Sequence, residues 1–176
     1  MNYYTLELLG ETRRLPLVAV SPKRRVASFN ILGDEKLVSK AGRALAKKAR
    51  GLRFDLLIGP EVKVVPLLQV MAGVLKQPRY IVCRKSIKGY MVRPKTSSAK
   101  PVLVLDGRDA ELIPGKSLLI VDDVVSTGRT IIVLKELVES LGGKVIGAAA
   151  ILRQGEDFLA DFPNFFCLGQ LPVFKT

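Results

Sequence analysis

Residues 118–130 read LLIVDDVVSTGRT and carry the strongest structural signal in the chain. The apolar residues of this stretch predict a buried strand from Ser117 to Val121. Two carboxylates, Asp122 and Asp123, follow at the carboxyl end of that strand, and a short turn rich in hydroxyl groups leads into an amphipathic helix predicted over Thr130–Leu141. Because ligands of open α/β sheets bind at the carboxyl ends of the strands, we expect a ligand site at this junction.

The turn from Ser126 to Thr130 has the chemistry of a phosphate site. It precedes a helix N-terminus, where backbone N–H groups lack intrahelical partners and the helix dipole favours an anion. Gly128 allows a close approach of the backbone, and the hydroxyl groups of the turn can donate to phosphate oxygens. Ionised carboxylates are acceptors only, so the adjacent Asp122 and Asp123 suit the two hydroxyls of a ribose.

Strand and helix patterns alternate along the rest of the chain. They predict a hairpin over Thr5–Val20 that turns at Gly10-Glu11, a helix from an Asp34 N-cap to Arg50, a strand at Asp55–Gly59, a helix from Pro66 to Lys76, and strands at Tyr80–Cys83, Val102–Leu105 and Val145–Leu152. Such alternation predicts a parallel α/β sheet with right-handed crossovers. The length of 176 residues indicates one domain over 1–176.

Composition narrows the possible chemistry. The chain has no His, which excludes imidazole bases and ligands and leaves acid–base work to Asp, Glu, Lys or Tyr. Its two cysteines, Cys83 and Cys167, are too few for a disulfide framework and favour a reducing, cytoplasmic setting. No apolar run approaches the ~18 residues that span a bilayer, and the N-terminus lacks the pattern of a signal peptide, so we expect no membrane association.

The formal net charge of +12 indicates an anionic partner. The basic residues are dispersed, in segments such as Lys23-Arg24-Arg25 and Lys47-Lys48-Ala49-Arg50, and aromatic residues make up only 6% of the chain, so the sequence indicates no stacking platform for bases. We therefore expect no nucleic-acid partner, and a polyanionic small substrate accounts for part of the positive charge.

The order hydrophobic run, Asp-Asp, two apolar residues, Ser-Thr-Gly-x-Thr resembles the signature that binds phosphoribosyl pyrophosphate (PRPP) in type I phosphoribosyltransferases. The chain is similar to these enzymes from about Phe29 to Gly155, above all to adenine and xanthine phosphoribosyltransferases, and departs from the commonest signature where Arg129 replaces a second Gly. The resemblance implies an open, mostly parallel twisted sheet flanked by helices, with a small hood contributed mainly by residues 1–33. It also implies a homodimer.

The resemblance assigns further parts of the PRPP site. The stretch Ile58-Gly59-Pro60-Glu61-Val62-Lys63 lies where adenine phosphoribosyltransferases have a pyrophosphate loop, although the usual small-Arg-Gly portion is here Val62-Lys63-Val64. The pair Arg84-Lys85 matches the basic residues presented to the diphosphate, and Lys88 joins them. The implied PRPP-binding residues are Asp122, Asp123, Ser126, Thr127, Gly128, Arg129, Thr130, Glu61, Val62, Lys63, Arg84, Lys85 and Lys88. The implied catalytic residues are Asp122, Asp123, Arg84 and Lys85.

The stretch over 88–100 corresponds to the family's flexible loop, which closes over the reacting centre. Many adenine-type members carry a Glu in this loop, and here Tyr90 and Lys95 are the available substitutes. The implied base-binding residues are Phe29, Asn30 and Val124. Phe29 either stacks on the base or is a core residue, and Asn30 reads the edge of the base.

These features imply a purine phosphoribosyltransferase, which moves 5-phosphoribose from PRPP to a ring nitrogen of the base and releases pyrophosphate in purine salvage. Adenine is favoured over xanthine, guanine and hypoxanthine, with orotate a distant alternative. Mg²⁺ is the implied cofactor, held mainly by PRPP and water. Two other interpretations stay open: a PRPP-binding regulator of the purine-repressor type without catalysis, and a partner subunit that has lost catalytic activity.

Overall fold

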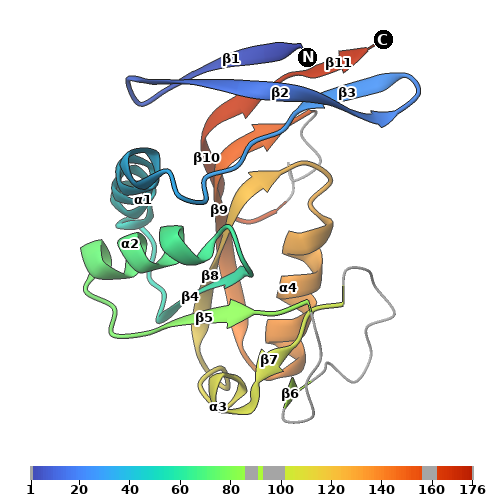
Figure 1. The fold of residues 1–176 in the computed structure, drawn as a ribbon. Helices are drawn as coiled ribbons and strands as arrows, with labels where there is room; N and C mark the ends of the chain where they lie inside the picture. The colour runs from blue at the N-terminus through green and yellow to red at the C-terminus, as the bar shows by residue number, and fades with distance from the viewer. Residues whose placement is uncertain (1, 86–90, 93–101, 156–161, 176) are drawn as a thin grey trace.

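The computed structural model describes residues 2–85, 91–92, 102–155 and 162–175 (Figure 1). At its centre is a five-stranded sheet in the order β10-β9-β8-β4-β5, in which every pair of neighbouring strands is parallel. Its strands are β4 (Leu56–Pro60), β5 (Tyr80–Cys83), β8 (Ser117–Val125), β9 (Lys144–Gln154) and β10 (Phe165–Leu171). The predicted parallel α/β class is confirmed.

Helices cover both faces of this sheet (Figure 1). One face carries α1 (Glu35–Ala49) and α2 (Val65–Leu75), and the other carries α4 (Arg129–Ser140). Neighbouring residues of β8 point to opposite faces: Leu119 packs in the core beneath α1 and α2, and Ile120 packs in the core beneath α4. Burial on both faces explains why the apolar run of this strand is continuous. No helix in the described part of the chain is long and apolar enough to cross a membrane.

The strand order reverses between β4 and β8. From β4 the chain proceeds to β5 on one side, and from β8 it proceeds through β9 to β10 on the other. The two strands pair in parallel, with Leu56 opposite Leu118 and Ile58 opposite Ile120. Such a reversal opens a crevice at the carboxyl ends of the two strands, because the connections leave in opposite directions. The ligand edge predicted from residues 118–130 borders this crevice.

A second sheet, with four strands in the order β1-β2-β3-β11, lies at the top of the view in Figure 1. Its antiparallel strands are β1 (Tyr3–Leu8), β2 (Glu11–Ser21), β3 (Arg24–Ala27) and β11 (Val173–Lys175). The predicted N-terminal hairpin is confirmed, but its turn lies at Leu9 and Gly10, both of which have positive φ, and not at Gly10-Glu11, because Glu11 already pairs with Leu8. Neither β3 nor the addition of the C-terminal β11 was expected from the sequence.

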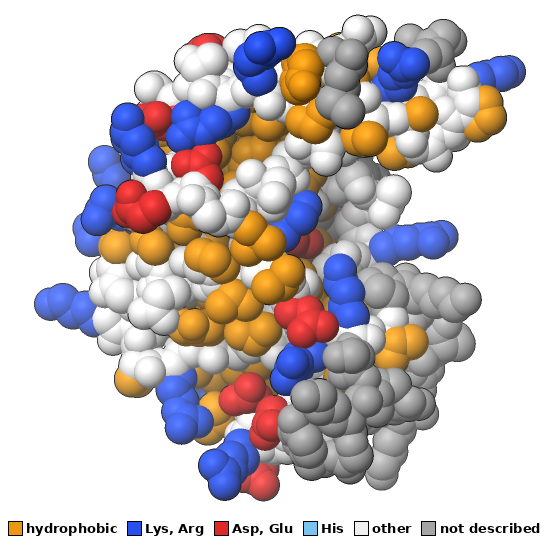
Figure 2. Space-filling model, in the orientation of Figure 1, with side chains coloured by type: hydrophobic (Ala, Val, Ile, Leu, Met, Phe, Trp, Pro, Cys, Tyr) orange, Lys and Arg blue, Asp and Glu red, His pale blue; other side chains and the backbone are white. Residues whose placement is uncertain are grey.

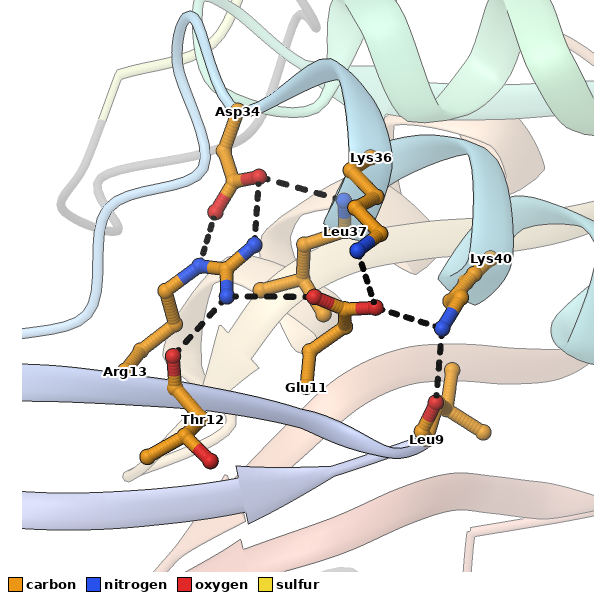
Figure 3. Close-up of polar contacts among 8 residues, drawn as sticks. All are labelled: Leu9, Glu11, Thr12, Arg13, Asp34, Lys36, Leu37 and Lys40. Atoms are coloured by element: carbon orange, nitrogen blue, oxygen red, sulfur yellow. Dashed lines mark hydrogen bonds and ion pairs between the residues drawn. The ribbon is translucent and has the colours of Figure 1, made fainter.

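An ionic cluster joins this antiparallel sheet to α1 (Figure 3). The guanidinium of Arg13, on β2, donates from Nε and Nη2 to the two carboxylate oxygens of Asp34, at 2.6 and 2.9 Å. Asp34 also accepts from the backbone N–H of Leu37 at 3.1 Å, which confirms it as the N-cap of α1. The carboxylate of Glu11, also on β2, binds two lysines of the helix, Lys36 and Lys40. The cluster thereby holds the second sheet against the first helix.

One predicted strand lies outside the parallel sheet. The segment expected to form a strand at Val102–Leu105 contributes only Leu105–Asp106 (β7), which pairs in antiparallel fashion with Met91–Val92 (β6). The side chain of Asp106 accepts from a backbone N–H of the short helix α3 (Gly107–Ala110) and acts as its N-cap. The prediction was wrong because Val104 forms only an isolated antiparallel bridge with Arg84, so the strand begins at Leu105, and the cap ends it after Asp106.

Candidate functional site

A cavity of about 500 Å³ lies at the carboxyl ends of β4 and β8, where the strand order reverses. A volume of this size is typical of a small-molecule site. The cavity is lined by Pro60, Glu61, Val62, Lys63, Val64, Lys85, Asp122, Asp123, Val124 and Thr130. Of these residues, only Pro60 and Val64 are absent from the predicted binding residues, although the resemblance had placed Pro60 in the pyrophosphate loop and Val64 in its altered portion.

The loop that follows β4 forms one wall of the cavity. It runs from Glu61 to Val64 and leads into α2, and the peptide bond between Glu61 and Val62 is cis. The loop approaches β8 closely because Gly59 has no side chain. A Cβ at this position would lie 2.6 Å from the carbonyl oxygen of Val121 and 2.8 Å from Cγ1 of Val64, so glycine is needed for the approach.

Two carboxylates of β8 form the opposite wall. β8 extends to Val125 rather than ending at Val121, so Asp122 and Asp123 lie within the strand and not after it, as the sequence had suggested. Asp122 is 6% exposed, and its Oδ1 accepts from the backbone N–H of Asp123 at 2.8 Å. Burial, and then the charge of Asp123, raises the pKa of Asp122 above its ordinary value.

Oδ2 of Asp123 lies beside a cation but accepts no hydrogen bond from the described residues. This oxygen is buried, and the ammonium of Lys63 lies 3.5 Å away from it. A buried carboxylate oxygen without a donor is costly, so this atom favours a ligand that brings a hydroxyl. Nothing in the sequence spacing of Lys63 and Asp123 predicts that they meet.

The turn between β8 and α4 has the geometry of an anion site. Gly128 is the N-cap of α4 and has a φ of 65°, a left-handed conformation that favours glycine. Gly128 has no side chain that could cap this helix, so the first N–H groups of α4 have no capping partner among the described residues. A cavity of about 40 Å³ adjoins the turn and is lined by Asp122, Val124, Val125, Ser126, Thr127, Gly128, Arg129, Thr130 and Ile131. It shares Asp122, Val124 and Thr130 with the larger cavity.

The basic pair after β5 contacts the loop after β4. The carboxylate of Glu61 accepts from the backbone N–H of Lys85 at 2.8 Å and from Nε of Arg84 at 3.2 Å. The pKa of Glu61 is lowered by these contacts, the N–H of Lys85 first among them. Lys85 lines the cavity, and Arg84 is held by Glu61. The remaining predicted loop residues, Lys88, Tyr90 and Lys95, lie outside the described residues, as does the loop over 88–100 apart from Met91–Val92.

Of the three residues predicted to contact a base, only Val124 is among the described residues that line the cavity. Phe29 is 4% exposed and belongs to the hydrophobic core. Of its two predicted roles, stacking on a base or packing in the core, the structure supports the second. Its backbone carbonyl accepts from Nζ of Lys63 at 3.0 Å. Asn30 is exposed, and its Oδ1 accepts from the backbone N–H of Leu32 at 3.2 Å, so its amide is engaged in a local turn.

Comparison with known proteins connects this geometry to one family. Residues 29–168 match the family model for the phosphoribosyl transferase domain. An adenine phosphoribosyltransferase from Leuconostoc citreum is 33% identical over 128 residues, which cover 70% of this chain and 71% of that protein. An orotate phosphoribosyltransferase from Caldanaerobacter subterraneus is 32% identical over 114 residues, which cover 65% of this chain and 52% of that protein.

A solved structure shares the overall architecture. The crystal structure of adenine phosphoribosyltransferase from Thermoanaerobacter pseudethanolicus superposes with a TM-score of 0.69 and covers 89% of this chain and 95% of that one. The sequence identity in this comparison is 24%, so the likeness bears on the fold alone. Together with the family match, it confirms the type I fold that residues 118–130 predicted.

Proposed function

The chain belongs to the phosphoribosyltransferase family, and on this premise we propose that it transfers the 5-phosphoribosyl group of PRPP to adenine, with release of pyrophosphate, in purine salvage. One observation carries the proposal: the carboxylates of β8 and the uncapped start of α4 line two adjoining cavities at the point where the strand order reverses. Hydroxyl acceptors beside an anion site suit a ribose 5-phosphate.

The 5′-phosphate lies over the turn from Ser126 to Thr130 in this proposal. Gly128 lets the backbone approach it, the first N–H groups of α4 and the hydroxyls of the turn donate to its oxygens, and the exposed Arg129 adds positive charge. The ribose hydroxyls donate to Asp122 and Asp123. The buried Oδ2 of Asp123, which accepts no hydrogen bond from the described residues, supports this assignment.

The diphosphate lies against the loop after β4. Lys63 and Lys85 line the cavity there and supply positive charge, and Glu61 keeps the backbone of Lys85 and the side chain of Arg84 in place. Backbone N–H groups of the loop supply further donors, which explains how Val62-Lys63-Val64 can replace the small-Arg-Gly of related enzymes. Lys88 is a further candidate, outside the described residues.

The carboxylates at the cavity suit Mg²⁺ as a companion of the substrate. Glu61, Asp122 and Asp123 offer the hard oxygen atoms that this ion prefers, but the described residues contain no group of three or more metal-binding side chains close enough to hold it alone. The ion would therefore bind mainly to the diphosphate and water. When bound, it neutralises charge on the diphosphate.

Stabilisation of the departing diphosphate and positioning of the base supply most of the catalysis in this proposal. The bond between the ribose carbon and the diphosphate breaks while a ring nitrogen of the base bonds to the same carbon, which carries positive charge in between, and the base gives up its ring proton to water. Lys63 and Lys85 stabilise the charge that develops on the leaving group. The four-stranded sheet and Val124 enclose the base, in the role of the hood, and hold it in line with that carbon.

Adenine is the preferred base because the adenine-specific relatives are 31–33% identical over 71% of their own length, whereas the orotate-specific relatives are 28–32% identical over 52–59% of theirs. The similarity to orotate phosphoribosyltransferases makes orotate the second candidate. A cytoplasmic homodimer is the expected form of the enzyme, and sedimentation analysis would establish the assembly state.

Pyrophosphate release tests the function directly. The purified protein is given PRPP and Mg²⁺ with adenine, guanine, hypoxanthine, xanthine or orotate in turn, and Asp123→Asn is assayed beside it. We expect release with adenine and a large loss of activity in the variant without loss of folding. PRPP binding without release for any base would refute the transferase and favour the regulator, and a fully active Asp123→Asn would show that the ribose is held elsewhere.

A further inference from the structure

The outward side of α1 carries a row of positive charges. Five cations recur at intervals of four, three, four and three residues: Lys36, Lys40, Arg43, Lys47 and Arg50. At 3.6 residues per turn these positions fall within about 80° of the helix circumference, and the row is about 21 Å long. Figure 2 shows Lys and Arg side chains gathered at the left edge of the molecule, over α1. We call these five residues the α1 basic row.

Most of this charge has no acidic partner. Lys36 and Lys40 bind Glu11, at the end of the row nearest the antiparallel sheet. The other three residues of the row form no ion pair with any described residue, and the neighbouring Lys48 and Arg53 are also exposed and unpaired. Like charges four residues apart on a helix repel, so the row carries an energetic cost that an anionic partner would remove.

The proposed reaction does not use these cations. The opposite side of α1 is buried against α2, β9 and β10, whereas the PRPP cavity lies at the carboxyl ends of β4 and β8. None of the five residues lines either cavity described above. The row therefore needs an explanation separate from the binding of PRPP, and it accounts for part of the net charge of +12 that a single small substrate does not require.

We propose that the α1 basic row binds the phosphate backbone of double-stranded nucleic acid. A row of about 21 Å laid along a duplex spans a length of axis that carries about twelve phosphate charges, because the two strands together carry one charge per about 1.7 Å. The apolar side of α1 is buried, so the helix cannot insert into a lipid surface, and the row contains no aromatic residue for stacking on unpaired bases. Binding through phosphates alone is independent of base sequence.

The basic residues are dispersed along the sequence, which indicated no nucleic-acid partner. In the folded protein, α1 brings several of them together. Cations that are scattered in the sequence, including Lys47 and Arg50 but not Lys48, are brought onto one side of a helix by its period. The proposal adds an electrostatic contact to the enzyme and leaves its catalytic cavity unchanged.

Fluorescence anisotropy with labelled 20-base-pair duplexes of DNA and of RNA tests the proposal. The parent protein is compared with Arg43→Gln/Lys47→Gln/Arg50→Gln and with a control of equal charge, Lys23→Gln/Lys116→Gln/Lys144→Gln, over a range of NaCl concentrations. We expect the row variant to bind at least about tenfold more weakly and to lose about 2.7 from the slope of log K against log salt, as three lost phosphate contacts require. The control should change much less.

Three results would overturn the proposal. They are the absence of duplex binding at about 50 mM salt, an equal loss of affinity in the row variant and the control, and tighter binding to anionic phospholipid vesicles or to a poly-glutamate peptide than to either duplex. Circular dichroism verifies that each variant is folded. Pyrophosphate release is measured in parallel, so that failure of the proposed enzyme activity and failure of nucleic-acid binding are seen separately.

Discussion

The ammonium nitrogen of Lys63 lies 3.5 Å from Oδ2 of Asp123, and the same nitrogen donates to the backbone carbonyl of Phe29 at 3.0 Å. One side chain thus connects three parts of the fold: the loop after β4, the carboxylates of β8 and the segment that leaves the antiparallel sheet. Because Oδ2 of Asp123 accepts no hydrogen bond from the described residues, the charge of Lys63 is its main compensation.

Replacement of Lys63 by Met should weaken the binding of PRPP. The variant loses positive charge beside the diphosphate and leaves Asp123 without its cation, so we expect the KM for PRPP to rise about tenfold, the low end of what a charged hydrogen bond contributes. Lys135→Met is the matched control, since Lys135 binds Glu139 at 2.7 Å on the exposed side of α4. An unchanged KM in Lys63→Met would show that the contact is structural only.

Replacement of Asp122 by Asn should alter the pH dependence of stability. A buried carboxyl with a raised pKa holds its proton more tightly when folded, so the parent loses stability as pH rises from the ordinary value of 3.8 towards the raised one. Asn stays neutral and still offers an oxygen to the backbone N–H of Asp123. We expect the Tm of the variant, relative to the parent, to increase between about pH 5 and pH 8, by about 2 °C or more.

Differential scanning calorimetry across that range measures the effect. Asp55→Asn is a suitable comparison, because Asp55 is exposed. A constant difference in Tm between Asp122→Asn and the parent at every pH would mean that Asp122 ionises as easily in the folded protein as in the unfolded one. The same variant should bind PRPP more weakly above the raised pKa of Asp122, where the parent has a carboxylate, which is a better acceptor for ribose hydroxyls than a neutral amide.

The sequence predicted the part of the site that comes from one continuous stretch. Residues 118–130 combine a buried strand, two carboxylates and a helix start, and each has a local signal in the chain, so both their structure and their position at the sheet edge were predictable. The Asp34 N-cap was predictable for the same reason.

Contacts between distant segments were not predictable. The Lys63–Asp123 pair joins two strand ends that only the sheet order brings together. The strand β11 pairs with β3 across most of the chain length, and neither segment is long enough to show a clear period. Phe29 illustrates the same limit: its neighbours along the chain could not decide between stacking on a base and packing in the core, and its burial did.

Replacement of Glu11 by Gln should remove part of the acid sensitivity of the protein. Its pKa is lowered from 4.5 to about 2, chiefly by the hydrogen bonds from Lys40 and Lys36 (Figure 3). A carboxyl group whose pKa is lowered on folding stabilises the folded protein at pH values above its pKa in the unfolded chain. This stabilisation is lost as pH falls from 4.5 towards 2.

The parent should therefore have the higher Tm near neutral pH, and its advantage over Glu11→Gln should shrink as the solution is acidified through that window. Thermal unfolding followed by circular dichroism at several pH values tests this. Glu139→Gln, which removes an exposed ion pair on α4, is expected to have little effect at any pH. An advantage of the parent that persists at pH 2 would contradict the role given to Glu11.

Replacement of Gly59 by Ala should destabilise the protein and disturb the loop after β4. The added Cβ would lie 2.6 Å from the backbone carbonyl oxygen of Val121 and 2.8 Å from Cγ1 of Val64, and neither strand nor loop can yield without moving the cavity wall. Overpacking of this kind costs about 1–3 kcal/mol. Since about 2–4 °C of Tm corresponds to each kcal/mol in a chain of this size, the loss is measurable by calorimetry.

Gly73→Ala is the matched control for this substitution. Gly73 lies inside α2, and a Cβ there meets nothing within 4 Å. Alanine favours the helix over glycine by about 0.5–1 kcal/mol, so this variant should unfold at a higher temperature than the parent. Gly59 and Gly73 lie on either side of the same loop. Because the changes in Tm expected for the two substitutions have opposite signs, the comparison distinguishes a loss of packing between β4 and β8 from a general effect of alanine. If Gly59→Ala were as stable as the parent and bound PRPP equally well, the close approach of the loop to β8 could not be what shapes the cavity.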